Sequence, residues 1–217
     1  KPDLQGIWQV NGRVGYDLEA HVARHDMPPG LGIVAEGAIP YLPAALERRH
    51  ANRLHRWTAD PEIKCYMPGV PRANYLPYPF QIVQGSDTIL MSYEFADAVR
   101  TVHMQDPGPA PAKSWMGWNV GHWEGNSLVV EITDQNNQTW LDRSGNFHSD
   151  KLHVTERYTP MGSDMLLYEA TLTDPEVFAA AWTIRMPLYR RKEANAQLIE
   201  FKCIPFAESV LYDAIGR

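Results

Sequence analysis

Apolar and polar residues alternate along much of this chain, and turn residues break the alternation at short intervals. The pattern begins after Pro79 and continues towards the C-terminus. A period of two residues is typical of a strand with one buried face, and a glycine turn between two such runs indicates a hairpin. The predicted strands cover residues 80–84, 88–94, 99–104, 116–122, 127–133, 152–158, 165–172, 182–190 and 197–202.

Most of these strands are joined by hairpins, with Gly85-Ser86-Asp87 and Glu124-Gly125-Asn126 as two of the turns. Closing such a meander into a barrel removes its exposed edges. We therefore expect a mainly β fold, an antiparallel meander closed into a β-barrel of about nine strands over residues 80–217. A chain of 217 residues is expected to form a single domain.

Residues 1–79 have a different pattern, rich in Pro and Gly with little β alternation. We expect them to form an appendage that contains strand and short helices. One helix is predicted over residues 16–25 and a better one over 42–57, where Pro43 suits the first turn. The basic residues of the second helix are expected to form a solvated face. They are Arg48, Arg49, His50, Arg53, His55 and Arg56.

The charge balance argues against a nucleic-acid partner, and the short apolar runs argue against a membrane span. Twenty Lys and Arg against 26 Asp and Glu give a net charge of −6, whereas a nucleic-acid binder needs a basic face. The longest apolar run is Val177 to Trp182, far short of the roughly 20 residues that span a bilayer. We expect neither a nucleic-acid partner nor a membrane span, and the sequence leaves the oligomeric state open.

The two cysteines, Cys65 and Cys203, leave two alternatives open. No C-x-x-C pair is present, so a thiolate zinc site or a redox motif is not supported. They are either two buried free thiols or one disulfide that joins the segment before the barrel to the last predicted strand. A disulfide implies an oxidising compartment, so we expect a secreted or periplasmic protein.

Titratable groups are densest in the segment from Trp140 to Tyr158, whose first half is predicted to be a loop and whose second half a strand. Loops at a barrel mouth often hold catalytic groups, and histidine suits acid–base work near neutral pH. The candidate base is His148 or His153, oriented by Asp142, with Arg157 or Tyr158 stabilising an anion. The candidate catalytic residues are Asp142, His148, His153, Glu156, Arg157 and Tyr158.

The alternation limits how this segment is arranged. His153 and Arg157 share one face of the predicted strand, and Glu156 and Tyr158 share the other. His153 and Glu156 therefore cannot both enter one lumen without a bulge. The alternative is structural: His148 caps the loop, and Glu156 and Arg157 form cross-strand ion pairs.

Aromatic residues and histidines supply candidate ligand-binding positions. The candidates are His103, Trp115, Trp118, His122 and Trp140. A metal site formed by His103, His122, His148 and His153 is an alternative, but no H-x-H or H-E-x-x-H spacing supports it. We predict no metal and no cofactor, and a small molecule as substrate or ligand.

Two resemblances add to this interpretation. Gly6-Ile7-Trp8 resembles the Gly-x-Trp entry of lipocalin-type barrels, which implies a lipocalin-like barrel. Longer blocks resemble a large, functionally uncharacterised family of secreted bacterial proteins, in which a His often stands where this chain has Trp118. These blocks are Cys65-Tyr-Met-Pro-Gly-Val-Pro-Arg72, Tyr78-Pro-Phe-Gln-Ile82, Trp115-Met-Gly117, Gly121-His-Trp-Glu-Gly125, Leu128-Val-Val130, Thr139-Trp-Leu-Asp142, His148-Ser149 and Leu152-His-Val-Thr-Glu-Arg-Tyr158.

Three functions compete on this basis. The favoured one is a secreted barrel enzyme that uses histidine-centred acid–base chemistry on a small aromatic or lipophilic molecule, as a lyase, isomerase, cyclase or cofactor-free hydrolase. The second is a non-catalytic, lipocalin-like carrier of an apolar ligand. The third is a protein with a histidine-bound metal.

Overall fold

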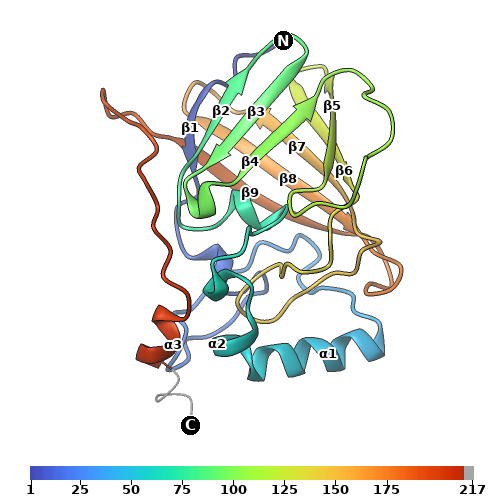
Figure 1. Ribbon diagram of the computed structural model, residues 1–217, viewed down its shortest axis with the longest axis vertical. Helices are drawn as coiled ribbons and strands as arrows, with labels where there is room; N and C mark the ends of the chain where they lie inside the picture. Colours follow the sequence, from blue (N-terminus) through green and yellow to red (C-terminus); the bar gives the residue numbers. More distant parts are fainter. Residues whose placement is uncertain (213–217) are drawn as a thin grey trace.

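Nine strands form a closed barrel in the computed structural model, which describes residues 1–212 (Figure 1). Around the barrel they follow one another in chain order, and β1 pairs with β9 to close it. The strands are β1 (Gly6–Gln9), β2 (Phe80–Gln84), β3 (Thr88–Tyr93), β4 (Val99–His103), β5 (Trp118–Glu124), β6 (Ser127–Thr133), β7 (His153–Pro160), β8 (Met165–Thr173) and β9 (Trp182–Arg190). The prediction of a mainly β, closed barrel is confirmed.

One pair of neighbours corrects the expected antiparallel meander. Strands β4 and β5 are parallel and share only two register pairs, Val102 with Asn119 and His103 with Val120. Residues 104–117 carry the chain back, so that β5 runs in the same direction as β4. Pro107, Pro109 and Pro111 lie in this connection and have no N–H for a ladder, which prevents a tight hairpin there. The barrel is therefore mixed.

The last predicted strand is wrong, and the first strand of the chain takes its place. Residues 197–202 form no strand, although their sequence alternates. The edge of β9 is instead occupied by β1, through Trp8 with Arg190 and Gln9 with Tyr189. The barrel therefore begins at Gly6 and not at residue 80, and the count of nine strands is right only because β1 replaces the last predicted strand.

The strands β8 and β9 point their apolar faces into the barrel. In β8 the inward side chains Leu166, Tyr168, Ala170 and Leu172 are buried, and the residues between them are partly exposed. In β9 the inward set is Trp182, Ile184, Met186 and Leu188. Side chains thus fill the barrel, as is usual for barrels of this size.

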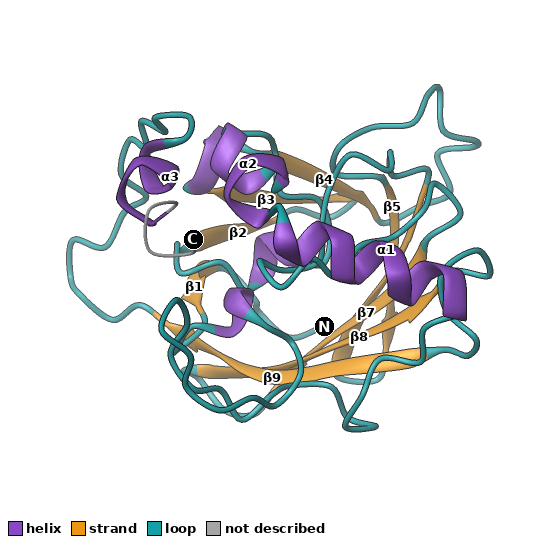
Figure 2. Cartoon of the chain, turned by 90° about the horizontal axis from the view of Figure 1, so that it is seen from below, coloured by secondary structure: helices purple, strands orange, loops and turns teal. Residues whose placement is uncertain are grey.

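Helices and loops cover the lower end of the barrel (Figures 1 and 2). The predicted helix over 42–57 forms α1 (Pro43–Leu54) and α2 (Arg56–Ala59), and α3 (Ala207–Tyr212) lies beside α2. Short 3₁₀ turns cover Val14–Tyr16, Glu62–Lys64, Arg72–Asn74 and Phe95–Asp97.

The helix predicted over residues 16–25 does not form. Only the 3₁₀ turn Val14–Tyr16 is present, and isolated bridges follow between His21 and Gly30 and between Arg24 and Met27. The carboxylate of Asp17 accepts a hydrogen bond from the backbone N–H of Glu19 at 3.1 Å. Such a local bond offers the backbone an alternative to a helix.

The basic face of α1 is not simply solvated, which corrects a third expectation. Arg49 donates to Asn146 at 3.2 Å, and Arg53 donates to Ser144 at 2.8 Å. The helix packs so closely on this loop that a Cβ at Gly145 would lie 2.7 Å from the backbone nitrogen of Arg53. The arginines therefore hold the loop after Trp140 against the lower end of the barrel.

A disulfide joins Cys65 to Cys203, which decides between the two alternatives for the cysteines. It fastens the C-terminal strap, residues 191–206, which runs down the outside of the barrel to α3 (Figure 1). No helix in residues 1–212 has the length and apolar character needed to cross a bilayer.

Removing the disulfide is expected to destabilise the fold. The bond closes a separation of 138 residues, and the chain-entropy model gives an upper bound of about 5 kcal/mol for such a loop. The double variant Cys65→Ser/Cys203→Ser should lose up to that amount of unfolding free energy in urea titrations. Equal stability of the variant and the wild type would contradict a stabilising role.

Candidate functional site

A buried ion pair lies inside the barrel. Arg100 on β4 and Glu156 on β7 are fully buried, and the guanidinium of Arg100 bonds to the carboxylate of Glu156. Asn74, from the 3₁₀ turn Arg72–Asn74, donates to the other oxygen of Glu156 at 2.7 Å. Both oxygens of this carboxylate are therefore held by donors in a water-poor interior.

Three tyrosines complete what we call the interior network: Asn74, Tyr93, Arg100, Asn119, Glu156, Tyr158 and Tyr168. Tyr168 donates to Glu156 at 2.6 Å, Tyr158 donates to the same carboxylate at 3.2 Å, and Tyr93 donates to Asn74 at 2.9 Å. Burial and the charge of Glu156 raise the pKa of Tyr158 and of Tyr168, and burial raises the pKa of Tyr93 to about 12. The three phenols therefore stay protonated and act as donors.

The network reaches the barrel wall at the parallel pair. Arg100 donates through Nε to Asn119 of β5 at 2.6 Å, and Asn119 donates to the carbonyl oxygens of Met116 and Gly117 at 3.1 and 3.0 Å. Because β4 and β5 share only two register pairs, the bond from Arg100 to Asn119 adds a side-chain link between the two strands beside this short ladder. We call this part of the wall the seam.

A pocket of about 230 Å³ lies on the seam, between β4 and residues 111–119. Arg100 and Asn119 are among its lining residues, so the pocket and the interior network meet there. Its wall includes His103 and Trp118, whose rings lie 4.7 Å apart between centroids. The indole N–H of Trp118 donates to the carbonyl oxygen of Gly108 at 3.0 Å, which fixes the ring. We call this cavity the seam pocket.

His148, the first candidate base, is completely buried. Its Nδ1 lies 2.8 Å from the carbonyl oxygen of Ser149, so Nδ1 carries the proton. Its Nε2 therefore accepts from Thr139 at 2.6 Å and from Gln135 at 3.1 Å. Burial lowers the pKa of His148, which keeps the ring neutral. This arrangement matches the structural alternative rather than a base facing a substrate.

Asp142 holds the loop instead of orienting a histidine. Its two oxygens accept from the backbone N–H groups of Leu18, Ser144 and Asn146 at 2.9 to 3.1 Å, and from the side-chain amide of Asn146 at 2.6 Å. Burial and the neighbouring Asp17 raise the pKa of Asp142 to about 7. Among the described residues, no hydrogen bond joins Asp142 to His148, so the expected base and orienter do not form a pair.

The alternation along β7 separates the remaining catalytic candidates as predicted. His153 and Arg157 lie outside, where His153 pairs with Glu131 at 2.8 Å and Arg157 pairs with Glu124 at 2.5 Å. Glu156 and Tyr158 lie inside, in the interior network. The six candidates therefore do not converge on one site, and the predicted catalytic arrangement is not formed.

Of the five ligand-binding candidates, His103 and Trp118 meet in the seam pocket. Trp115 packs on Tyr66 with 5.2 Å between ring centroids. His122 bonds to Glu124 on the outer surface at 3.0 Å. Trp140 is buried and forms a bridge with Phe147. The last three line no part of the seam pocket that the structure describes.

Five members of the interior network were not predicted from the sequence: Asn74, Tyr93, Arg100, Asn119 and Tyr168. Two of them left a signal. Arg100 shares a strand face with the buried Val102, and Tyr168 shares one with Leu166 and Ala170, so each places a polar group on a core face. Asn74 left none, because it lies on a 3₁₀ turn in a region without periodicity.

Neither a metal-binding cluster nor a relative helps to interpret the site within the described residues. Within residues 1–212, no cluster of three or more His, Cys, Asp or Glu side chains is arranged to hold a metal ion. The chain matches no protein-family model, and a search of curated proteins finds no relative. The site is therefore interpreted from its geometry.

Protonation of His148 is expected to destabilise the fold below neutral pH. Its pKa is lower in the folded than in the unfolded state, so its stabilising contribution is complete above about pH 6.5 and is lost as the pH falls. Below that pH, wild type should lose up to about 1.4 kcal/mol per pH unit more than His148→Gln in urea titrations. The exposed His50→Gln variant should behave like wild type, and parallel pH profiles for all three would contradict this.

Breaking the buried ion pair is expected to cost more than breaking a surface pair. Glu156→Gln leaves the charge of Arg100 buried without a carboxylate, and we expect a loss of about 3–5 kcal/mol of unfolding free energy. The control Glu131→Gln removes a partly exposed partner of His153 and should cost less than about 1 kcal/mol. Equal losses for the two variants in denaturant titrations would show that the interior pair is not critical.

Proposed function

We propose that this protein is a β-barrel that binds a small, flat, uncharged aromatic molecule in the seam pocket. The observation that supports this most is the pair of rings of His103 and Trp118 beside an open cavity of about 230 Å³. A cavity of this size suits a molecule of one or two rings. Because Trp118 is fixed by its bond to Gly108, its ring needs little ordering when a ligand stacks on it.

The lining indicates which polarity the ligand has. Arg100 is already neutralised by Glu156, so the pocket offers no unpaired charge among its described lining residues. Thr101 and Ser114 supply hydroxyl groups, and the ring nitrogens of His103 make no hydrogen bond with another described residue. An aromatic molecule with a hydroxyl or amide group matches this combination.

Acid–base catalysis at the same pocket is the second candidate, and His103 is the residue that favours it. Its imidazole lines the cavity, and its ring nitrogens make no hydrogen bond within residues 1–212. By contrast, both ring nitrogens of His148 are hydrogen-bonded, and His153 is paired with Glu131 on the outer surface. The lyase, isomerase, cyclase or hydrolase chemistry predicted for a histidine base then belongs to His103. The carrier hypothesis then also concerns the seam pocket.

We also propose that the protein works in the periplasm or outside the cell, since disulfides such as Cys65–Cys203 persist in oxidising compartments. Membership of the uncharacterised secreted family remains a prediction from the sequence blocks. The lipocalin-like character of the barrel and the role of residues 10–79, between β1 and β2, as an appendage belong to the same proposal.

Ligand binding is tested with a panel of uncharged phenols and naphthols, 2-naphthol included, by titration calorimetry. We expect Trp118→Ala to weaken binding at least tenfold, because it removes the stacking surface. Trp115→Ala is the matched control, since Trp115 packs on Tyr66 outside the pocket lining, and it should bind like wild type. Absence of binding across the panel, or equal losses in both variants, would refute the proposal.

Catalysis is tested with the panel members that bind, incubated with the protein in deuterated water. An acid–base enzyme should speed the exchange of a ligand C–H proton or convert the ligand, as seen by NMR. His103→Gln should abolish that activity and keep binding within a few-fold of wild type. Binding without any wild-type turnover leaves the protein as a binder, and turnover that survives in His103→Gln excludes His103 as the base.

A further inference from the structure

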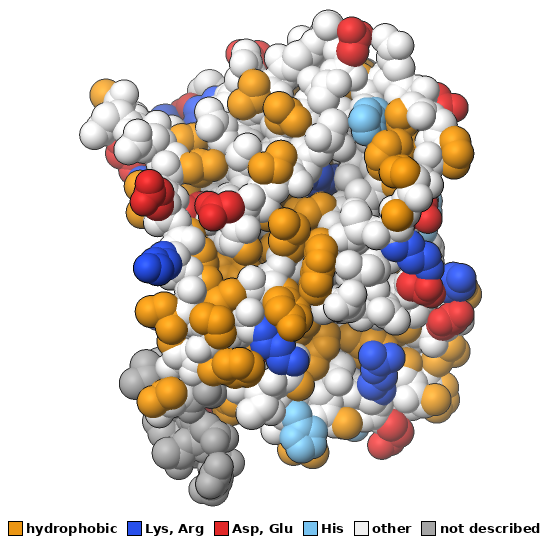
Figure 3. Space-filling view, viewed as in Figure 1, with side chains coloured by type: hydrophobic (Ala, Val, Ile, Leu, Met, Phe, Trp, Pro, Cys, Tyr) orange, Lys and Arg blue, Asp and Glu red, His pale blue; other side chains and the backbone are white. Residues whose placement is uncertain are grey.

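A second pocket, of about 250 Å³, lies between the lower end of the barrel and the C-terminal strap, and we call it the strap pocket. One wall is aromatic: Tyr78 and Phe95 each face Phe201 of the strap, with ring centroids 4.7 and 5.1 Å apart. Figure 3 shows hydrophobic side chains gathered down this face of the molecule, from the strands towards the helices. The other wall is charged.

The charged wall is built around Arg143, whose side chain is 13% exposed. Glu62 holds one edge of the guanidinium with two hydrogen bonds, from Nε at 2.9 Å and from Nη2 at 2.7 Å. The ring of Tyr16 lies 4.9 Å from its central carbon. The position and orientation of Arg143 are therefore set by the protein.

Glu62 is itself fixed from behind. Arg72 donates to it at 2.5 Å and to the two oxygens of Asp60 at 2.8 and 2.9 Å, and these three side chains are almost completely buried. Arg72 and Arg143 carry two positive charges, and Asp60 and Glu62 carry two negative ones. The inner part of the cluster is thus neutral before any other group is added.

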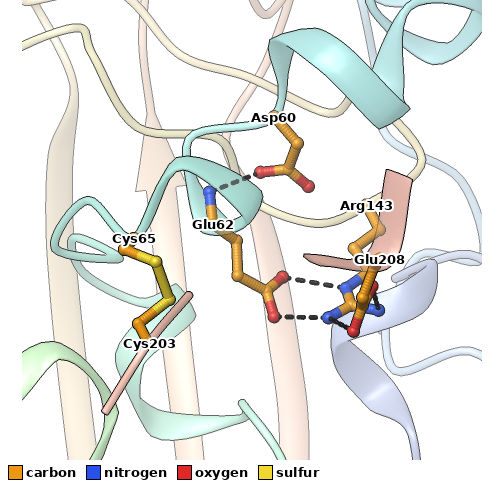
Figure 4. The surroundings of a disulfide bond; sticks show 6 residues. All are labelled: Asp60, Glu62, Cys65, Arg143, Cys203 and Glu208. Atoms are coloured by element: carbon orange, nitrogen blue, oxygen red, sulfur yellow. Dashed lines mark hydrogen bonds and ion pairs between the residues drawn. A yellow bond between two sulfur atoms is a disulfide. The ribbon is translucent and has the colours of Figure 1, made fainter. Parts of the chain in front are cut away.

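The outer edge of Arg143 binds one more carboxylate, that of Glu208 on α3 (Figure 4). Its Nη1 and Nη2 donate to the two oxygens of Glu208 at 2.9 and 3.2 Å. The Glu208 side chain is 38% exposed and makes no other hydrogen bond or ion pair within the described residues. Glu208 belongs to a helix of six residues that follows the strap in the chain. Its bond to Arg143 is therefore weaker than that of the buried Glu62.

We propose that the outer edge of Arg143 is a recognition site for a planar carboxylate attached to a ring or a short apolar body, and that Glu208 occupies the carboxylate position in the free protein. A guanidinium held on one edge presents two parallel N–H groups on the other, which is the geometry of bidentate carboxylate binding. The aromatic wall of the same pocket receives the body of the ligand. Glu208 then acts as an internal competitor that the ligand displaces.

The site differs from the seam pocket in position and in ligand charge. The seam pocket has no unpaired charge among its described lining residues, whereas the strap pocket is lined by Arg143, whose outer partner is exchangeable, and by Lys202. The two proposals therefore stand independently, and different probes test them.

Benzoate is the probe, and benzamide is its uncharged counterpart. Removing the competitor with Glu208→Ala should raise the affinity for benzoate at least tenfold over wild type in calorimetric titrations at pH 7. Benzamide should show no such gain. The matched control is Glu193→Ala, which removes another glutamate of the C-terminal segment that pairs with an arginine, Arg191, away from the pocket. It should leave benzoate affinity unchanged.

Two further variants locate the bound probe. In the Glu208→Ala background, Phe201→Ala should remove much of the gain, and Arg143→Lys should remove most of it because lysine lacks the bidentate edge. Trp118→Ala in the seam pocket should leave the gain in benzoate affinity unchanged. Equal benzoate affinity in wild type and Glu208→Ala, an equal gain for benzamide, or a gain that survives Arg143→Lys would overturn the proposal. Circular dichroism spectra like that of wild type would show that each variant is folded.

Discussion

The Arg100–Glu156 ion pair is the interaction on which the barrel depends most. Two opposite charges buried together are stable only when their remaining donors and acceptors are satisfied, and here Asn74, Asn119 and two tyrosines satisfy them. The pair also connects distant parts of the chain: the 3₁₀ turn before the barrel, strand β4 and strand β7. Through Asn74 and Asn119, the pair also links residues 72–74 and strand β5 to the same point in the interior.

The second constraint is the mixed topology of the wall. Eight of the nine neighbouring strand pairs are antiparallel. The single parallel pair, β4 with β5, has two register pairs, fewer than any other two strands that are consecutive in the chain. Side chains replace missing backbone bonds there, and the proline-containing connection covers the gap. A cavity forms where the ladder is incomplete, which explains why the candidate ligand site lies in the wall and not at the mouth of the barrel.

Local sequence signals predicted the fold better than the site. Alternation located eight of the nine strands, because each has one face buried in the barrel. It failed at residues 197–202, where the pattern is present but β1 already occupies the edge of β9. The titratable groups between Asp142 and Tyr158 are dense in sequence but do not meet at one place, since Asp142 and His148 bond to buried backbone groups. Arg100 and Asn119 are far from that segment in sequence, so only the barrel brings them to Glu156.

The closing contact between β1 and β9 sets the order in which the chain can become a barrel. Residues 8 and 9 pair with residues 190 and 189, so all the strands between them must be made before the wall is complete. Until then β1 and β9 each present an open edge, and contacts of such long sequence separation form slowly. Cys203 emerges later still, so its bond to Cys65 is made on a chain that already holds every strand. The disulfide therefore attaches the strap to a chain in which all nine strands are already available to close the wall.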